Sequence, residues 1–359
     1  MTPITKDEME TPALLIDRDL LENNIDTMAK FINNKKAKLR PHFKTHKCPT
    51  ISHKQINAGA KGITCAKLGE AETLVLAGIR DVLIANTIVQ PSKIMRLASL
   101  ARGDAKISVA TDNQQNIRDL SEAAITVGST IHVLVEVDIG MERCGVNTPE
   151  EVLQLAQKII EARGLEFEGI QAYEGHLVYN TDIDARRQGV QKAADKLNKI
   201  KEFIKNNGIT VNQVSGGGTG TYNLTGNNMI WTEVQAGSYI FMDTMYERLG
   251  LEFKNALSIL ATVIHKRPGM AVTDAGLKVC STEQGPPRIK KYPHLKFHDE
   301  LSEEHSTIID PRDELTYLQK IEYIPSHCCT TVNLHDYFYC MRNGYLEIVW
   351  PISARGKSQ

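Results

Sequence analysis

The sequence predicts a (β/α)8 barrel of the TIM type followed by a C-terminal antiparallel β domain. Over residues 18–249, eight short apolar runs alternate with amphipathic segments, and strands that alternate with helices pair in parallel. Eight such units are the number that closes a β/α barrel. After about Leu249 the helical periodicity gives way to short strand-like runs, which indicates a separate β domain. An open, doubly wound sheet is the alternative for the first part.

The barrel part begins after a short apolar strand at 13–16. Asp17 or Asp19 can cap a first helix that runs to about residue 33. The eight barrel strands are expected at 38–44, 62–66, 81–85, 106–110, 130–138, 167–173, 211–214 and 233–241. Helices with apolar residues at helical spacing are expected between them at 68–76, 91–101, 114–126, 149–162 and 186–205.

The second part of the chain consists of short strands. They are expected at 258–265, 271–273, 306–309, 321–324 and 345–350. We therefore predict a barrel domain at 18–249 and a β domain at 250–359, to which the N-terminal segment 11–17 contributes a strand. The segment 285–298, with two adjacent prolines and a basic run, is expected to be an exposed loop.

Composition limits the classes of function. The 359 residues are enough for one large and one smaller domain. The 42 basic and 43 acidic side chains nearly cancel, so nucleic acid and anionic membranes are not expected partners, and a small molecule is. Seven irregularly spaced cysteines do not form a disulfide framework. The polar, acidic start and the lack of a membrane-spanning apolar run predict a cytoplasmic protein.

A dense basic block at 40–49 contains the residue with the strongest chemical potential, Lys44. A lysine at the C-terminal end of a strand, after apolar residues, can lose its proton through burial and attack a carbonyl group. That is the chemistry of a Schiff base. A solvated basic loop is the alternative, and these ten residues alone favour it.

The glycine-rich stretch at 214–221 directly follows the seventh expected strand. Consecutive glycine amides can form an anion nest, and the hydroxyls of Ser215 and Thr219 can add hydrogen bonds. In a β/α barrel, the loops after strands seven and eight are the usual phosphate site. The spacing fits neither a P-loop nor a dinucleotide motif. A flexible turn is the alternative.

Charged residues at 136–146 follow the fifth expected strand, at the mouth of the barrel. Arg143 can hold an anionic ring oxygen or a carboxylate. An ordinary ion pair with Glu142 or Asp138 is an equally good explanation.

The segment 325–333 contains a possible metal pair. In extended backbone, His327 and Cys329 point to the same face, and an imidazole beside a thiolate suits Zn²⁺ or a similar divalent ion. Two protein ligands leave an open site, which is typical of catalysis. A buried cysteine that acts as a small apolar residue is the alternative.

Together these motifs resemble the D-threonine aldolase and D-serine dehydratase family of alanine-racemase-like, fold type III pyridoxal phosphate enzymes. The matching stretches span most of the chain: 11–17, 40–47, 171–176, 235–239, 274–278, 302–305 and the His327-X-Cys329 pair. The resemblance implies that the cofactor forms a Schiff base with Lys44, that Arg143 lies beside its ring oxygen, and that His327 and Cys329 bind a metal such as zinc, manganese or magnesium. It also implies a set of further cofactor-binding residues: Tyr173, Ser215, Gly217, Gly218, Thr219, Gly237, Ser238 and Tyr239. The family fold is a barrel followed by a β domain, usually in a homodimer whose subunits share active sites.

The resemblance implies a lyase that acts on D-3-hydroxy amino acids, with two possible reactions. In β-elimination, loss of the α-proton and of hydroxide gives a 2-oxo acid and ammonia; in retro-aldol cleavage, loss of the β-hydroxyl proton gives glycine and an aldehyde. Family dehydratases tend to carry Cys as the second metal ligand, as Cys329 here. Aldolases tend to place a histidine where this chain has Tyr179, although His176 lies nearby, and we take both as candidate catalytic residues. We therefore expect a dehydratase, with the aldolase as the alternative.

Two other classes of function are weaker. A racemase needs a second acid-base residue, for which Tyr323 or Tyr337 is available, but it has no need of the metal pair. A non-catalytic pyridoxal phosphate carrier has no need of the β domain.

Overall fold

The computed structural model describes residues 3–359, which divide into two compact units. The barrel unit comprises Met28–Lys44, Ile51–Gly237 and Lys357–Gln359. The β unit comprises the N-terminal residues up to Thr27 together with Thr45–Thr50 and Ser238–Gly356.

The barrel unit contains an eight-stranded parallel sheet within the described residues, as predicted. Its strands, in the order in which they pair, are β2 (Lys38–Leu39), β9 (Glu233–Val234), β8 (Gln213–Gly216), β7 (Leu165–Gln171), β6 (Ile131–Glu136), β5 (Lys106–Thr111), β4 (Asp81–Ile84) and β3 (Ile63–Cys65). A parallel bridge between His42 and Thr64 joins the two ends of this order. The prediction of a TIM-like barrel is confirmed. Two expected strands were too long, because the strands that begin at Lys38 and Glu233 each end after two residues.

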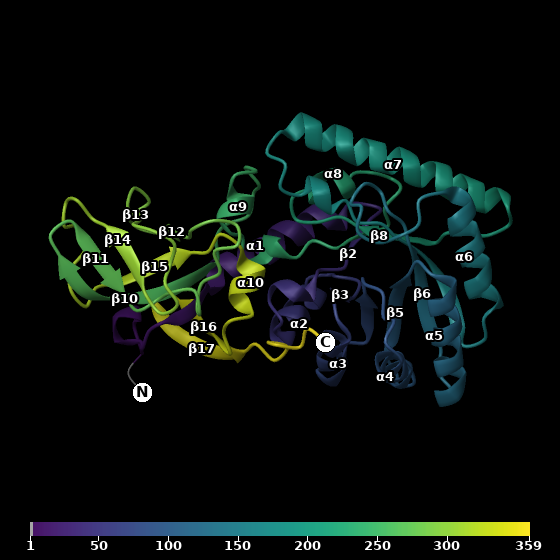
Figure 1. Ribbon diagram of the computed structural model, residues 1–359, viewed down its shortest axis with the longest axis horizontal. Coiled ribbons are helices and arrows are strands. Elements are labelled where there is room, and N and C mark those ends of the chain that lie inside the picture. The colour runs from purple at the N-terminus through teal and green to yellow at the C-terminus, as the bar shows by residue number, and fades with distance from the viewer. Residues whose placement is uncertain (1–2) are drawn as a thin grey trace. The chain divides into compact units, whose positions relative to one another are not determined.

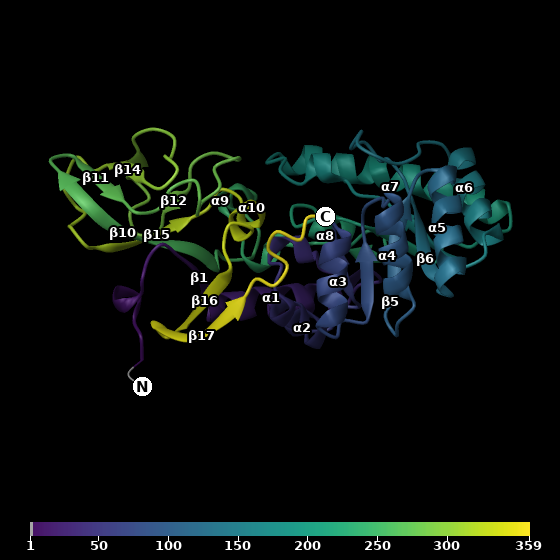
Figure 2. The ribbon, with the colours of Figure 1, turned by 60° about the horizontal axis from the view of Figure 1, so that its bottom comes forward.

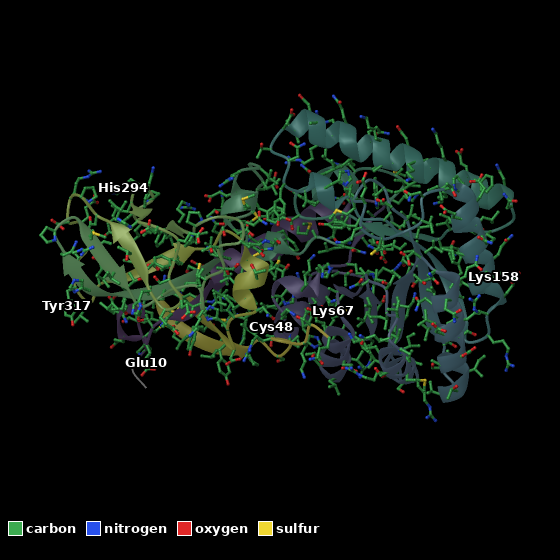
Figure 3. The ribbon with its side chains drawn as sticks, in the orientation of Figure 1. Glu10, Cys48, Lys67, Lys158, His294 and Tyr317 are labelled. Carbon is green, nitrogen blue, oxygen red and sulfur yellow. The ribbon has the colours of Figure 1, made fainter. Side chains whose placement is uncertain are left out.

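Helices surround the outside of this sheet (Figures 1 and 2). They are α2 (Pro49–Asn57), α3 (Leu68–Leu76), α4 (Pro91–Ala101), α5 (Gln114–Val127), α6 (Pro149–Glu161), α7 (Ile183–Asn206) and α8 (Tyr222–Thr225), after α1 (Arg18–Asn33). Helix α6 shows why they form: the Thr148 hydroxyl accepts the amide of Glu151, whose carboxylate accepts the amide of Thr148 in return. Its buried residues recur at intervals of three and four, whereas Lys158 lies on the outer surface (Figure 3).

The β unit contains a nine-stranded sheet within the part of the chain that the structure describes. Its strands are β1 (Ala13–Asp17), β10 (Leu257–Arg267), β11 (Met270–Thr273), β12 (Arg288–Ile289), β13 (Lys296–Phe297), β14 (Ser306–Ile309), β15 (Lys320–Ile324), β16 (Tyr337–Arg342) and β17 (Tyr345–Pro351). Two short helices, α9 (Thr244–Glu247) and α10 (Cys328–Val332), belong to the same unit. The N-terminal strand β1 pairs antiparallel with β10 and parallel with β16, so the expected antiparallel sheet contains one parallel pair.

Two expectations from composition can be compared with the structure. No disulfide joins any two of the seven cysteines, all of which lie within the described residues. Among the described residues, no helix is both long enough and apolar enough to cross a membrane.

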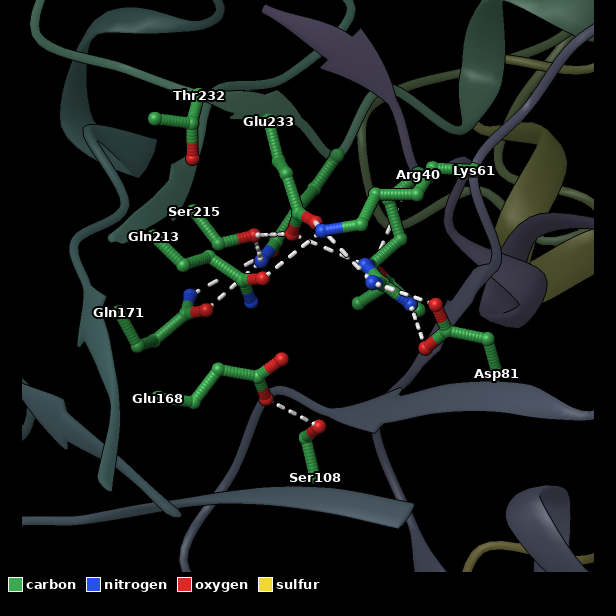
Figure 4. A network of polar contacts seen from close by, with 12 residues as sticks. Arg40, Lys61, Asp81, Ser108, Glu168, Gln171, Gln213, Ser215, Thr232 and Glu233 are labelled. Carbon is green, nitrogen blue, oxygen red and sulfur yellow. Dashed lines mark hydrogen bonds and ion pairs between the residues drawn. The ribbon is translucent and has the colours of Figure 1, made fainter. Parts of the chain in front are cut away.

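A polar network occupies the interior of the barrel (Figure 4). The guanidinium of Arg40, which has no exposed surface, donates two hydrogen bonds to Glu233 (2.9 and 3.0 Å) and two to Asp81 (2.7 and 3.2 Å). Lys61 also donates to Glu233, at 2.7 Å. Burial raises the pKa of Glu233, but the charges of Arg40 and Lys61 lower it more. Two cations and two carboxylates thus neutralise each other in a place where most barrels pack aliphatic side chains.

The network continues toward the carboxyl ends of the strands. The Ser215 hydroxyl donates to Glu233 at 2.9 Å and accepts the side-chain amide of Gln235 at 2.8 Å. The same amide of Gln235 donates to Gln171 at 2.7 Å. This chain of hydrogen bonds therefore runs from Arg40, which lies four residues before Lys44, to Gln171 and Gln235. Gln171 lies two residues before Tyr173, and Gln235 lies two residues before Gly237, both predicted cofactor residues.

Candidate active site

Lys44 lies in a 3-10 turn (Phe43–Thr45) that is tied to the barrel by its own backbone. The amide of His42 donates to the carbonyl of Ala236 at 3.2 Å, and the Lys44 amide donates to Nδ1 of His42 at 3.4 Å. Phe43 and Thr45 are buried, whereas Lys44 is exposed. The turn thus presents the Lys44 amine at the barrel mouth. Burial, which the sequence suggested as the cause of its reactivity, does not apply to this side chain.

Tyr173, just beyond β7, brings three loops of the barrel mouth together. A Cβ atom added to Gly218 would lie 3.3 Å from its ring carbon Cε2, and one added to Gly175 would lie 2.5 Å from Cε1. The guanidinium carbon of Arg143 lies 6.0 Å from the ring centroid, at the limit of a cation-π contact. Three predicted cofactor residues, Arg143, Tyr173 and Gly218, are therefore neighbours in the structure.

The glycine-rich loop after β8 is organised by a carboxylate that sequence reasoning missed. Glu174 is fully buried and accepts the Gly217 amide (3.0 Å) and the hydroxyls of Thr221 (2.7 Å) and Thr225 (2.5 Å). Gly217 has φ +78°, in the region that favours glycine. In the structure the Gly217 amide donates to Glu174 and the Gly218 amide donates to the Thr221 hydroxyl at 3.1 Å, and the phosphate nest stays a prediction.

The part of Ser215 in phosphate binding likewise stays a prediction. Its hydroxyl belongs to the barrel network described above, between Glu233 and Gln235. Thr219, in the middle of the same loop, is buried. The signal for Glu174 in the sequence was its place directly after Tyr173, but a lone glutamate in a loop gives no indication of burial.

The loop after β6 is held by two carboxylates. Oδ1 of Asp138 accepts the amides of Gly140 (2.8 Å), Met141 (2.8 Å) and Glu142 (3.1 Å), and Asp112 accepts the amide of Gly145 (2.9 Å). Burial raises the pKa of Asp138, but these three amides lower it more. Within the described residues, Oδ1 of Asp138 is occupied by these amides and no ion pair joins Arg143 to Asp138 or Glu142, so the ordinary ion pair considered as the alternative is not formed.

His176 and Tyr179, the two candidate acid-base residues, follow Tyr173 closely. His176 lies in a 3-10 turn (Gly175–Leu177), is exposed, and packs on the loop after β6, because a Cβ atom at Gly140 would lie 2.9 Å from its Cε1. Tyr179 is half-buried. The structure thus places His176 in the same group of loops as Arg143 and Tyr173.

Glu136, the last residue of β6, is a second acid that sequence reasoning did not single out. Its side chain is 7% exposed, and no donor in residues 3–359 reaches its buried Oε2. Burial raises the pKa of Glu136 to about 8; the charges of Asp112 and Asp138 add to the rise, and that of Arg143 opposes it. A buried carboxyl oxygen without a partner at a barrel mouth is typical of a ligand site.

In the β unit, the predicted metal pair lies beside the residues that follow Lys44 and Gly237. Sγ of Cys329 lies 3.4 Å from the Thr45 hydroxyl and 3.7 Å from that of Ser238. The expected extended backbone at 325–333 was wrong, because Cys329 belongs to helix α10. The two side chains nevertheless meet, since a hydrogen bond links Cys329 to His327.

Acidic groups surround His327. Its Nδ1 lies 2.9 Å from a carboxylate oxygen of Glu283, and Asp243 lies nearby, where it accepts the amide of Cys328 at 3.1 Å. Burial lowers the pKa of His327, but the hydrogen bond and charge of Cys329, with the charges of Asp243 and Glu283, raise it to about 9.

Three tyrosines of the β unit have different surroundings. Tyr239, a predicted cofactor residue, is fully buried with its ring 5.4 Å from that of Phe253. Tyr323 is also buried, and its hydroxyl bonds to Thr273 at 2.6 Å, whereas Tyr337 is exposed. Tyr323 is therefore engaged in the β-unit core, which weakens its case as the acid-base residue of a racemase.

The residues at the barrel mouth have the chemistry that pyridoxal phosphate needs. Lys44 offers an exposed amine for the aldehyde, and the glycine loop after β8 is tightly packed. Among the described residues, the guanidinium of Arg143 has no ion pair and Oε2 of Glu136 has no hydrogen-bond partner. The metal is less well supported: the described residues contain no group of three or more His, Cys, Asp or Glu side chains that could hold one. The imidazole and thiol of His327 and Cys329 suit zinc by donor type, as an open two-ligand pair.

Comparisons with known proteins show which families and relatives the chain resembles. Residues 16–245 match the family described as "Alanine racemase, N-terminal domain", and residues 256–341 match the "Putative serine dehydratase domain". A 3-hydroxy-D-aspartate aldolase of Paracoccus denitrificans (strain Pd 1222) is 38% identical over 98% of this chain and 93% of its own length. A D-threonine aldolase of Arthrobacter sp. is 40% identical over 98% of this chain and 94% of its own.

Two further proteins help to separate the possible reactions. The crystal structure of D-threonine aldolase from Filomicrobium marinum superposes with a TM-score of 0.96, at 38% identity and with 99% of each chain covered. The D-threo-3-hydroxyaspartate dehydratase of Delftia sp. (strain HT23) is 29% identical over 79% of this chain and 76% of its own length.

Proposed function

The chain belongs to the D-threonine aldolase and D-serine dehydratase family of alanine-racemase-like, fold type III pyridoxal phosphate enzymes, and we propose that it cleaves D-3-hydroxy amino acids to glycine and an aldehyde. One observation carries the choice of reaction. Two aldolases are 38% and 40% identical over 98% of the chain, whereas a dehydratase is 29% identical over 79%. The higher identity and coverage of the aldolases favour retro-aldol cleavage, the alternative reaction, over the dehydratase that the sequence led us to expect.

Pyridoxal phosphate, when bound, supplies an electron sink for the negative charge that develops at the substrate's Cα. We propose that the Lys44 amine binds its aldehyde carbon and that Arg143 and Tyr173 orient its ring. For the phosphate we propose the predicted set of Gly217, Gly218, Thr219, Gly237 and Ser238, with Glu174 shaping the loop by its hold on the Gly217 amide. The amides of Gly217 and Gly218 already donate to Glu174 and to the Thr221 hydroxyl. A bound phosphate therefore has to displace these two acceptors or share the amides with them.

Retro-aldol cleavage also needs a base for the β-hydroxyl proton. We propose His176 for this role, because its imidazole is exposed and lies among the loops that carry Arg143 and Tyr173. Tyr179 is the second candidate. We further propose that His327 and Cys329 hold a divalent metal, whose chemistry would be to polarise the β-hydroxyl oxygen.

A dehydratase is the second candidate function, and one observation favours it. The metal pair ends in Cys329, the residue type that family dehydratases tend to have at this position. Its thiol is among the groups that raise the pKa of His327, which supports the view that the two side chains act together.

The product distinguishes the two reactions. We expect the purified holoenzyme to form glycine with acetaldehyde from D-threonine, and glycine with glyoxylate from D-3-hydroxyaspartate; D-serine serves as a third substrate. Amino acid analysis and an aldehyde assay measure these products, and an ammonia assay with 2-oxo acid detection measures the alternative. Ammonia as the main product would make the enzyme a dehydratase.

Lys44 tests the cofactor part of the proposal. Lys44→Ala should remove the visible absorbance of the bound cofactor together with turnover. Lys158→Ala, which alters an exposed lysine on α6, is the matched control and should leave both unchanged. An unchanged spectrum in Lys44→Ala would refute the assignment.

A further inference from the structure

Glu136 points into the barrel at the end where the proposed cofactor binds. It pairs in register with Gln171 of the parallel neighbour β7, and residues in register on neighbouring strands point to the same face of a sheet. The Gln171 side chain bonds to Gln235 inside the barrel. Since both Glu136 and Gln171 end their strands, the carboxyl group of Glu136 lies at the carboxyl-end mouth of the barrel interior.

The carboxyl group of Glu136 is buried at a cost that the attraction of Arg143 offsets only in part. Its Oε2 has no partner among residues 3–359. An unsatisfied buried polar atom costs about 1 to 3 kcal/mol, and the great majority of such atoms in native proteins have a partner. A missing partner at a barrel mouth therefore points to a group that arrives with the ligand or moves when the ligand binds.

The charged groups that face Glu136 come from two segments. Asp112 follows β5, and Asp138 and Arg143 follow β6; the neighbour on β7, Gln171, is uncharged. Both aspartates repel a carboxylate at Glu136, and both are occupied by backbone amides. Arg143 is the one attractive charge of the three.

Arg143 lies close enough for its charge to attract a carboxylate at Glu136. Its side chain is exposed and makes no ion pair with a described residue, and its guanidinium carbon lies 6.0 Å from the centroid of the Tyr173 ring. Its backbone, in contrast, is held in place on both sides, by the three amides on Asp138 and by the amide of Gly145 on Asp112. With the backbone anchored in this way, a new pair between Arg143 and Glu136 would form through movement of the side chains.

We propose that Glu136 is a positioning residue, whose carboxylate pairs with Arg143 when the cofactor fills the barrel mouth and so holds the guanidinium at the cofactor ring. This inference rests on the proposed function, which places pyridoxal phosphate at this mouth. A guanidinium and a carboxylate can form two parallel hydrogen bonds, which fix orientation as well as distance. The bound ligand excludes water from the mouth and so strengthens the attraction.

The proton balance of this step gives a measurable signature. In the ligand-free protein Glu136 holds its proton up to about pH 8, and pairing with Arg143 requires the ionised form. Cofactor binding therefore releases this proton to solvent. The contribution of Glu136 to affinity should grow as pH rises, by up to tenfold for each pH unit, and level off near pH 8, where the free protein is itself ionised.

The test is a titration of cofactor-free protein with pyridoxal phosphate between pH 6 and pH 9, followed by visible absorbance. Wild type is compared with Glu136→Gln, which keeps the shape and removes the charge. The titrations of the cofactor and of Lys44 are common to both proteins and cancel in the ratio of their affinities. We expect wild type to bind pyridoxal phosphate no more than about threefold more tightly than Glu136→Gln at pH 6, and about ten- to a hundredfold more tightly at pH 8.5. Glu166→Gln, on an exposed residue of β7, should match wild type throughout.

A second variant separates positioning from a structural role. Arg143→Met should lose the same pH-dependent part of the affinity for pyridoxal phosphate as Glu136→Gln. In the double variant this loss should be no larger than in either single variant. Ratios that do not change with pH, or losses that add in the double variant, would overturn the inference. Glu136→Gln should melt no lower than wild type, which excludes unfolding as the cause. If wild type binds no pyridoxal phosphate at any pH, both proposals are overturned; if it binds and yields the expected products while the ratios stay flat, only this one is.

Discussion

At the scale of single residues, Glu174 shows how a buried acid shapes a binding loop. Its two carboxylate oxygens accept three donors: the Gly217 amide on one oxygen, and the hydroxyls of Thr221 and Thr225 on the other. Glutamine at this position has the same shape but only one accepting oxygen. Either the Gly217 amide or the two threonine hydroxyls would then face an NH₂ group. We predict that Glu174→Gln lowers the free energy of unfolding by about 2 kcal/mol and weakens pyridoxal phosphate binding.

Urea denaturation and a cofactor titration measure the two effects of Glu174→Gln. Glu161→Gln, on the exposed face of α6, is the matched control and should change neither. A variant as stable as wild type would show that the loop does not depend on this carboxylate.

The sequence suggested some residues of the candidate site but not the buried acids beside them. Lys44, Arg143 and Gly218 were predicted because amine, guanidinium and glycine chemistry can be recognised without coordinates. Glu136 and Glu174 look like ordinary solvated acids in the sequence, since their burial depends on strand register and loop packing. Whether such an acid is buried or solvated depends on contacts between residues that are far apart in the chain.

At the scale of elements, the alternation of strands and helices was predictable and their ends were not. The strand expected to reach Lys44 ends at Leu39, and the chain then passes through Pro41, which has no amide to donate to a sheet, into a 3-10 turn. The extended segment expected around His327 is a helix from Cys328 onward. Asp243 accepts the Cys328 amide at its first turn, a partner from elsewhere in the chain.

The barrel interior leads to a prediction about the stability of the sheet. Arg40→Met leaves Glu233, with a side chain only 1% exposed, facing one cation in place of two, and leaves Asp81 without its partner. Removing one member of a buried ion-pair network costs about 3 to 5 kcal/mol. We therefore predict a loss of this size in the free energy of unfolding, measured by urea denaturation at pH 7.

A surface pair provides the control for Arg40. Arg96 on α4 donates to Glu72 in a similar two-point pair, but its side chain is 45% exposed. Arg96→Met should change stability by no more than about 0.5 kcal/mol. Equal effects of the two substitutions would mean that the interior network contributes no more than a surface ion pair.

At the scale of the whole molecule, the two groups of the proposed chemistry are assigned to different units of the chain. The proposed Schiff-base lysine, Lys44, belongs to the barrel unit, and the proposed metal pair belongs to the β unit. The sequence alone did not decide between the two reactions, because Cys329 favoured elimination while the overall similarity favours cleavage. Both reactions use nearly the same residues, so this choice depends on small differences in geometry around the β-carbon.

The assignment to different units predicts that metal and cofactor can be removed separately. A chelator should suppress turnover of D-threonine while the visible absorbance of the cofactor stays, because the metal's proposed ligands do not include Lys44. Cys329→Ser should behave in the same way, and Cys144→Ser, at an exposed thiol, should not. Adding Mn²⁺, Zn²⁺ or Mg²⁺ back after chelation, one at a time, identifies the ion that restores activity. Full turnover after exhaustive chelation would show that the His327 and Cys329 pair is not a metal site; the hydrogen bond between them would then be a structural contact of α10.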